Sequence, residues 1–239
     1  MSLTATTPCI RNELDVLSAL LPLDGLQIIE LGCGNARLAR QLVQTYTDSH
    51  VTGLEVDVRQ HAQNVAQPHA RIHFVAAGAQ AIPCADAAFD LALMLKSLHH
   101  VPIALMDVAL GEVARVLRPG GHLYVSEPVY DGALNSIVRL FNDEGEVRAA
   151  AQSAVDRALH TGAWQQVAER RFEMPVHYAD FQTFEQRMMR PTFADHALTP
   201  ALIQRVAAAF APHCGPDGAH FTRPMHVRLL RRCQESQPA

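Results

Sequence analysis

The sequence of 239 residues lacks the features typical of a disulfide-rich protein, a zinc-binding protein or a membrane protein. Its five cysteines are odd in number and no two form a Cys-x-x-Cys pair, which argues against a disulfide framework and against a zinc site. No stretch reaches the roughly 18 apolar residues of a membrane span, and no basic segment followed by an apolar run opens the chain. We therefore expect a cytoplasmic protein with no membrane segment and no metal site.

A surplus of positive charge is also missing. Lysine and arginine number 20 against 24 aspartates and glutamates, which gives a net charge of −4 and a pI near 6.3. Nucleic acid is therefore not the expected partner, because its phosphate backbone demands a basic face. The strongest local cluster of basic residues comprises Arg170, Arg171, Arg228, Arg231 and Arg232. A solvated strand edge and a charged terminus explain this cluster more simply, so we expect a small-molecule partner and leave a homodimer open.

Short apolar runs and helical patterns alternate between about residues 26 and 126. This alternation is typical of βαβ units and a parallel sheet. Strands are predicted over residues 26–31, 51–56, 72–75, 89–95 and 122–126. Helices are predicted over residues 12–21, 38–46 and 106–117. Farther along, the patterns predict helices near residues 134–141, 147–155, 181–188 and 202–210, with strands near 171–178 and 225–229.

A glycine loop follows the first predicted strand. Gly32 and Gly34 stand at alternate positions between this strand and the next helix, where a backbone without Cβ can turn sharply and admit a ligand. A dinucleotide fingerprint would place a third glycine at the position of Arg37, so a dehydrogenase is the least favoured alternative. The carboxylate of Glu30 would repel a diphosphate but attract a sulfonium or ammonium group. A plain tight turn explains the glycines equally well on this evidence alone.

Glu55 lies at the carboxyl end of the second predicted strand, beside the ligand crevice of an open parallel sheet. A carboxylate there can accept two hydrogen bonds from the 2′- and 3′-hydroxyl groups of a ribose. Hydrogen bonds to charged groups contribute about 1.5–3 kcal/mol each. At this offset from a glycine loop, Glu55 favours a nucleoside ligand over simple solvation.

Taken in order, several segments resemble the motifs of class I, Rossmann-like S-adenosylmethionine-dependent methyltransferases. These segments are residues 30–36, 51–56, 74–83, 88–93, 98–101 and 112–123, so the resemblance covers about residues 24 to 128. Each motif is loose by itself, but their order and spacing are specific. The sequence is most similar to the branch whose members methylate small molecules such as quinone precursors, sterols and natural products.

The resemblance implies a seven-stranded, mostly parallel sheet with an antiparallel last strand, helices on both faces and a helical cover in the C-terminal part. It implies a single domain over residues 1–239, with a cofactor-binding core at 24–128, a variable substrate cover at 129–200 and a C-terminal helix and strand at 201–239. The implied cofactor is S-adenosylmethionine. The residues implied to bind it are Glu30, Gly32, Cys33, Gly34, Glu55, Val56, Gly78, Ala79 and Lys96.

The sequence departs from the family pattern at two positions. Such enzymes often carry Asp at the adenine-side position where this chain has Gly78, so either cofactor affinity is lower or Gln80 compensates. Ala36 replaces the more usual third glycine, which is a milder change because alanine suits a helix start.

Methyl transfer is an in-line displacement in which positioning supplies about 7–11 kcal/mol of the barrier, and a base is required only for an acceptor atom that still carries a proton. The candidate catalytic residues are His99 and His100, just past the fourth strand, and Glu127, after the fifth. Residues 130–162 are a candidate substrate lid, although a surface helix would show the same pattern. Residues with weaker claims to acceptor or cofactor contact are Arg11, His160, His177 and Tyr178, whereas Trp164, Phe172 and Phe181 are expected in the core.

The leading interpretation is therefore an enzyme that methylates an oxygen, nitrogen or carbon atom of a small organic acceptor. Two alternatives stay open at this point. One is a cofactor-binding protein without turnover, and the other is a methyltransferase that acts on RNA or protein.

Overall fold

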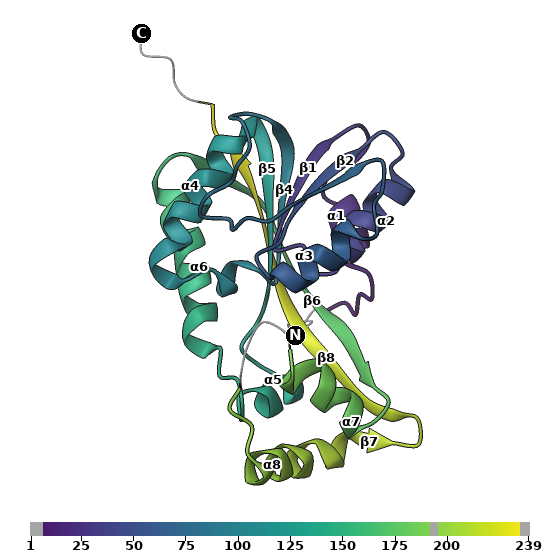
Figure 1. Ribbon diagram of the computed structural model, residues 1–239. Helices are drawn as coiled ribbons and strands as arrows, with labels where there is room; N and C mark the ends of the chain where they lie inside the picture. Colours follow the sequence, from purple (N-terminus) through teal and green to yellow (C-terminus); the bar gives the residue numbers. More distant parts are fainter. Residues whose placement is uncertain (1–6, 192–195, 235–239) are drawn as a thin grey trace. The chain divides into compact units, whose positions relative to one another are not determined.

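A mixed β-sheet runs through the computed structural model, which describes residues 7–191 and 196–234 (Figure 1). The strand order is β3-β2-β1-β4-β5-β8-β6, and the short strand β7 pairs with β8. The strands are β1 (Gln27–Leu31), β2 (His50–Leu54), β3 (Ile72–Val75), β4 (Phe89–Leu95), β5 (Leu117–Pro128), β6 (Trp164–Tyr178), β7 (Cys214–Gly215) and β8 (Gly218–Arg232). Strands β1 to β5 pair in parallel and the final long strand is antiparallel, as predicted.

The helices that connect these strands are mostly short. The α-helices are α1 (Glu13–Ser18), α2 (Arg37–Thr45), α3 (Val58–Val65), α4 (Met106–Val116), α5 (Ala133–Val138), α6 (Gly145–His160), α7 (Phe181–Phe184) and α8 (Pro200–Phe210). Shorter turns of 3₁₀ or π type are η1 (Leu98–His100), η2 (Ile103–Leu105), η3 (Glu185–Met189) and η4 (Ala211–His213). Among the described residues, no helix combines the length and the apolar character needed to cross a membrane.

The described chain forms two compact units. One unit contains residues 13–127, 147–170 and 227–234, and we call it the sheet unit. The other contains residues 7–12, 128–146, 171–191 and 196–226, and we call it the cover unit. Its interior is an aromatic cluster that includes Tyr178, Phe184, Phe210 and Phe221.

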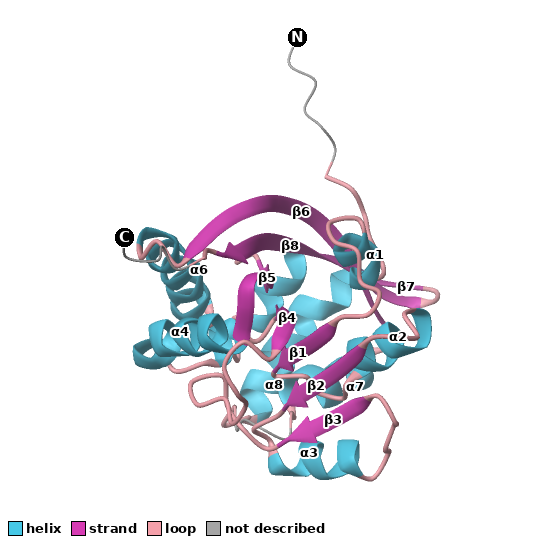
Figure 2. Ribbon diagram, turned by 90° about the horizontal axis from the view of Figure 1, so that it is seen from above, coloured by secondary structure: helices cyan, strands magenta, loops and turns pink. Residues whose placement is uncertain are grey.

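Helices cover both faces of the sheet in the sheet unit, with α1, α2 and α3 on one face and α4 and α6 on the other (Figures 1 and 2). Helix α4 packs against its face of the sheet because its apolar residues recur at helical intervals and so form one buried stripe. That stripe is Met106, Ala109, Leu110, Val113 and Val116. The central strand β4 is buried almost throughout, as its unbroken apolar run predicts.

The largest differences from the sequence-based prediction are the starts of two strands and the arrangement of the predicted lid. The fifth strand begins at Leu117, five residues before its predicted start at His122, and therefore includes a Pro-Gly-Gly segment. The sixth strand begins at Trp164, seven residues before the predicted start at Arg171. The predicted lid over residues 130–162 is also divided, because α6 buries Ala151, Ala154 and Val155 in the core of the sheet unit. The second half of the predicted lid is therefore a helix that packs in the core of the sheet unit. The domain boundaries beyond residue 128 stay a prediction.

Candidate active site

The carboxyl ends of the parallel strands bring the predicted binding residues to one edge of the sheet. Leu31 is in register with Leu54, so the glycine loop after β1 and Glu55 after β2 leave the sheet side by side. Leu95 is in register with Ser126 on the other side, so Lys96 after β4 lies beside Glu127 at the end of β5. Open parallel sheets bind ligands at this edge.

The glycine loop has a backbone that requires its glycines. Gly32 and Gly34 have φ values of +72° and +52°, where a side chain is strained. A Cβ on Gly32 would lie 2.9 Å from the Cβ of Ser97, whereas a Cβ on Gly34 would meet no atom within 4 Å. Ala36 also has a positive φ of +56°, just before α2 begins. A side chain at position 32 would therefore collide with Ser97, whereas Gly34 faces open space.

The peptide groups of Gly34 are held on both sides by side chains. The Gly34 N–H donates to Glu55 Oε2 at 2.8 Å, and the second oxygen of Glu55 accepts from the N–H of Asp57 at 2.8 Å. The Gly34 carbonyl accepts from Asn64 Nδ2 at 2.7 Å. Asn64 lies on α3, is buried, and is oriented in turn by Gln60 through a 3.1 Å hydrogen bond. The carboxylate and the amide thus fix the shape of the loop before any ligand binds.

Glu30 is a buried carboxyl group on β1 with an unusual environment. Its side chain is 5% exposed, and the atom Oε2 has no hydrogen-bond partner. Burial raises the pKa of Glu30 from 4.5 to about 8, and the charges of Glu13 and Glu55 act in the same direction. A backbone hydrogen bond at Ala39 and the charge of Lys96 partly oppose this shift. A buried carboxyl group with one unpartnered oxygen would be stabilised in its ionised form by a cationic ligand.

Lys96 is held by a residue that the sequence patterns did not single out. Its backbone has a φ of +54°, and its ammonium group lies 3.2 Å from Glu13 Oε2. Glu13, on α1, is almost fully buried and also accepts a 3.3 Å hydrogen bond from the hydroxyl of Tyr124. Burial raises the pKa of Tyr124, which keeps this phenol protonated as a donor. Glu13 therefore ties α1 to the ends of β4 and β5.

His99 and Glu127, two of the three predicted catalytic residues, form a buried pair. Their side chains are 3% and 1% exposed, and Nδ1 of His99 contacts Oε2 of Glu127. The other oxygen of Glu127 accepts from the N–H of Leu98 at 2.9 Å, which fixes the carboxylate in place. Because an ionised carboxylate only accepts, it favours the imidazole tautomer with the proton on Nδ1 and the acceptor on Nε2. His100 is exposed, and its ring centroid lies 4.1 Å from that of His99.

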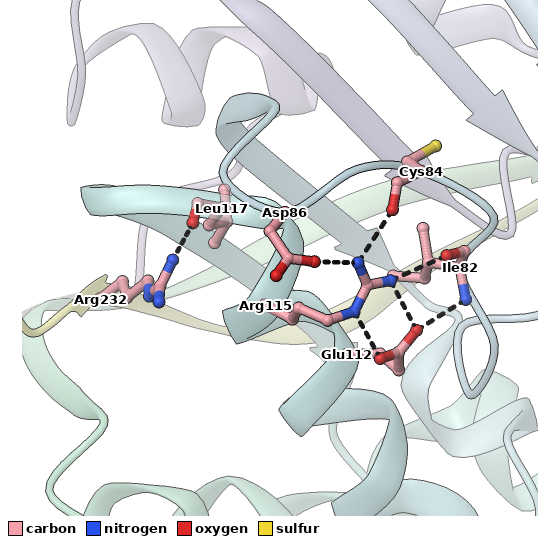
Figure 3. A network of polar contacts seen from close by, with 7 residues as sticks. All are labelled: Ile82, Cys84, Asp86, Glu112, Arg115, Leu117 and Arg232. Atoms are coloured by element: carbon pink, nitrogen blue, oxygen red, sulfur yellow. Dashed lines mark hydrogen bonds and ion pairs between the residues drawn. The ribbon is translucent and has the colours of Figure 1, made fainter. Parts of the chain in front are cut away.

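The segment after β3, which contains Gly78 and Ala79, is held in place from α4. Figure 3 shows the guanidinium group of Arg115 at the centre of this network. It donates to the carbonyls of Ile82 and Cys84, both at 2.9 Å, and to Asp86 Oδ1 at 2.6 Å. It also forms a bidentate pair with Glu112, whose Oε2 accepts from the N–H of Ile82 at 3.0 Å. All five donors of the arginine are used, which holds this segment against the helix.

The remaining candidates lie in varied environments. Val56 is 67% exposed beside Glu55, and its role beside the adenine ring stays a prediction. Cys33 is buried, and burial raises the pKa of its thiol, which makes it a poor nucleophile. His160 caps the end of α6 through the carbonyl of Asp156. Trp164 and Phe172 are buried, as predicted for core residues.

The cover unit contains the other residues with weaker claims. Tyr178 is buried in the aromatic cluster, with Phe181 packed against it, and His177 bonds the carbonyl of Asp217. Arg11 is exposed. These positions do not test a role in acceptor binding, which stays a prediction.

The candidate basic cluster is largely engaged within the protein. Arg228 is buried and donates to Asp156 and Gln166. Arg231 donates to Gln165, and Arg232 donates to the carbonyl of Leu117 (Figure 3). These contacts support the simpler explanation of the cluster as part of a strand edge.

The pKa of Glu30 predicts how stability depends on pH. Its value of about 8 in the folded protein lies above the ordinary 4.5, so folding favours the protonated form. The stabilisation is complete below pH 4.5 and is lost as the pH rises to about 8, with a slope of at most about 1.4 kcal/mol per pH unit. We expect Glu30→Gln, a neutral substitute of the same shape, to remove this dependence. Urea unfolding of both proteins between about pH 5 and 9 measures it, and two curves that stay parallel would contradict the prediction.

Comparison with known proteins agrees with this geometry. Residues 28–121 match the family model described as a methyltransferase domain. An O-methyltransferase of Penicillium expansum is 35% identical over 119 residues, which cover 47% of this chain and 41% of that protein. A fatty-acid O-methyltransferase of Mycolicibacterium smegmatis is 35% identical over 121 residues, which cover 48% of this chain and 42% of that protein. The matched part of the chain therefore spans less than half the length of these relatives.

Solved structures extend the likeness to nearly the whole chain at the level of the fold. The YcgJ protein of Bacillus subtilis superposes with a TM-score of 0.64 and 14% identity, covering 93% of this chain and 98% of that one. The [4+2]-cyclase SpnF superposes with a TM-score of 0.58 and 20% identity, covering 92% of this chain and 80% of that one. Residues 28–121 thus match a methyltransferase domain, and the fold of the chain is Rossmann-like. The resemblance and the fold class predicted from the sequence are confirmed.

Proposed function

We propose that the protein transfers the methyl group of S-adenosylmethionine to a hydroxyl or carboxyl oxygen of a small organic acceptor. The observation that carries this proposal is the buried pair of His99 and Glu127 at the ligand-binding edge of a methyltransferase sheet. A hydroxyl acceptor carries a proton that must leave, and a histidine with a fixed tautomer is suited to accept it, whereas an ionised carboxylate attacks without a base. The named relatives support oxygen as the acceptor atom, since two of them are O-methyltransferases.

The residues at the edge of the sheet fit the cofactor. The open space in front of Gly34 admits a ligand close to the backbone, and the unpartnered Oε2 of buried Glu30 suits a positively charged group. Each carboxylate oxygen of Glu55 accepts one backbone N–H and can accept a further hydrogen bond. Two such acceptors suit the two hydroxyls of a ribose. The exposed side chain of Val56 suits one face of the adenine ring.

Bound S-adenosylmethionine supplies an electrophilic methyl group and a neutral thioether leaving group. The remaining work falls to side chains of this protein. His99 accepts the acceptor's proton at Nε2 as oxygen attacks carbon, and Glu127 stabilises the imidazolium that forms through its contact with Nδ1. Lys96 is available to a carboxylate at the methionine end, because its side chain is one-third exposed while its ammonium group pairs with Glu13.

Calorimetry with S-adenosylmethionine and S-adenosylhomocysteine tests the cofactor, with nicotinamide dinucleotides as controls. We expect a dissociation constant of order 100 μM or tighter for the sulfur ligands, which corresponds to about −5.5 kcal/mol, and no binding of the dinucleotides. Mass spectrometry of reactions with fatty acids, phenols and alcohols then tests the acceptor as a gain of one methyl group. Absence of binding would contradict the assignment, and binding without methylation of any acceptor would favour a cofactor-binding protein without turnover.

A further inference from the structure

The turn after β3 lacks a side chain at Gly78, and a neighbouring side chain takes up its place. An ideal Cβ on Gly78 would lie 2.5 Å from Oε1 of Gln80 and 2.7 Å from its Nε2. Real Cβ atoms do not come so close to other atoms. The amide of Gln80 therefore occupies the volume that any side chain at position 78 would need.

The backbone around this amide is well anchored. Ala79 is 8% exposed, and the N–H of Ala81 donates to the Gly78 carbonyl at 3.2 Å. Immediately afterwards, Glu112 and Arg115 hold the N–H and carbonyl of Ile82 (Figure 3). The Gln80 amide itself makes no hydrogen bond within the described ranges 7–191 and 196–234. A fixed backbone thus presents an amide whose hydrogen-bonding capacity is unused.

The turn that carries this amide and Glu55 follow two neighbouring parallel strands. Val75, the last residue of β3, is in register with Leu54, the last residue of β2. The N–H of Glu55 donates to the Val75 carbonyl at 3.1 Å. Glu55 and the turn at Gly78 therefore leave neighbouring strands at the same edge, so a ribose at Glu55 would direct its base toward the turn.

The chemistry of an amide suits the edge of a 6-aminopurine. Adenine displays an amino donor next to ring-nitrogen acceptors, and a glutamine side chain offers one acceptor oxygen and donor N–H groups in matching order. A carboxylate at position 78 would only accept. We propose that the side-chain amide of Gln80, lying over Gly78, binds the adenine edge of the cofactor and takes over the contact that a residue at position 78 would otherwise make. This inference rests on the proposed function, because it takes the ligand to be an adenine nucleoside.

Calorimetry tests whether Gln80 contacts the 6-amino group of adenine, by comparing the affinities of two ligands. The ligands are S-adenosylhomocysteine and its analogue with hydrogen in place of that amino group. We expect the unchanged protein to bind the analogue roughly three- to tenfold more weakly than S-adenosylhomocysteine, the range of one hydrogen bond. In Gln80→Ala, S-adenosylhomocysteine should weaken by a similar factor and the preference between the two ligands should vanish.

A second variant keeps the glutamine but moves it. In Gly78→Ala the new Cβ must displace the amide, so the same loss of preference is expected although Gln80 remains. Gln67→Ala, at an exposed position just beyond α3, is the matched control and should retain both affinities. Equal weakening of both ligands in Gln80→Ala, or no weakening at all, would overturn the inference while the cofactor assignment stands. Failure of the unchanged protein to bind S-adenosylhomocysteine would instead overturn the proposed function itself.

Discussion

Glu55→Ala is expected to weaken S-adenosylhomocysteine binding by at least about 100-fold, because the change removes hydrogen bonds to a charged group that contribute about 1.5–3 kcal/mol each. The carboxylate has two tasks in the proposed site. It receives the ribose hydroxyls, and it holds the N–H groups of Gly34 and Asp57 in their positions. Loss of the side chain therefore removes ligand contacts and also releases the loop that faces the ligand. Calorimetry at a fixed pH and salt concentration measures the change.

Asp57→Ala is the matched control for this prediction. Asp57 stands two residues after Glu55 and caps α3 through a 2.9 Å bond from the N–H of Arg59, but its contact with Glu55 uses only its backbone. The variant should lose about 1 kcal/mol of stability, as expected for a helix cap, and keep its ligand affinity. Equal affinities of Glu55→Ala and the unchanged protein would show that the nucleoside does not bind at this edge.

Glu127→Gln is expected to lower kcat for methyl transfer by roughly 10²- to 10⁴-fold while leaving cofactor affinity within about threefold. Leu98 already donates an N–H to Glu127 Oε1, so an amide at this position turns its oxygen toward Leu98 and its NH₂ toward Nδ1 of His99. An NH₂ group facing Nδ1 forces the proton onto Nε2, and the imidazole then lacks the acceptor that the reaction needs. In serine proteases, replacing the aspartate behind the catalytic histidine with asparagine leaves the geometry intact but imposes the wrong tautomer, and the same logic applies to this pair.

The measurement compares kcat and the cofactor dissociation constant, using the acceptor found by mass spectrometry. His99→Asn should lose a similar factor in kcat, because the proton acceptor is removed. His122→Gln, farther toward the start of β5, is the control and should retain its rate. A Glu127→Gln protein with normal kcat would assign both residues to structure and leave His100 as the remaining candidate base.

The conformation of the glycine loop and the place of Glu55 could be predicted from the sequence because their signals are local. Gly32 and Gly34 need their backbone conformation, and Glu55 follows a strand whose position in the sheet is set by the βαβ pattern. Asn64 and Glu13 could not be predicted in the same way. Asn64 reaches Gly34 from 30 positions along the chain, and Glu13 meets Lys96 from 83 positions away. Polar residues on predicted helices are normally solvated, so only the packing of α1 and α3 against the sheet reveals their roles.

The pairing of the catalytic candidates could not be predicted from the sequence either. The sequence placed His99 and Glu127 after neighbouring strands, but as separate candidates. Their pairing depends on the register of β4 and β5, which matches Leu95 with Ser126 and so brings the following residues together. Register is set by side-chain packing and by the connections between strands, and a pattern of apolar residues does not specify it to the residue. The earlier start of β5 escaped prediction because the proline and glycines at its beginning normally indicate a turn.

Lys96, held by Glu13 at the end of β4, is the one lysine in the sequence. Its ε-amine is therefore chemically unique among the side chains, and it stands at the proposed methionine end of the ligand. An amine-directed reagent adds to this side chain and, where its amine is accessible, to the chain's first residue. The mass added to the intact protein, compared with and without nucleoside, would thus show whether a ligand occupies the site. This measurement requires no knowledge of the acceptor.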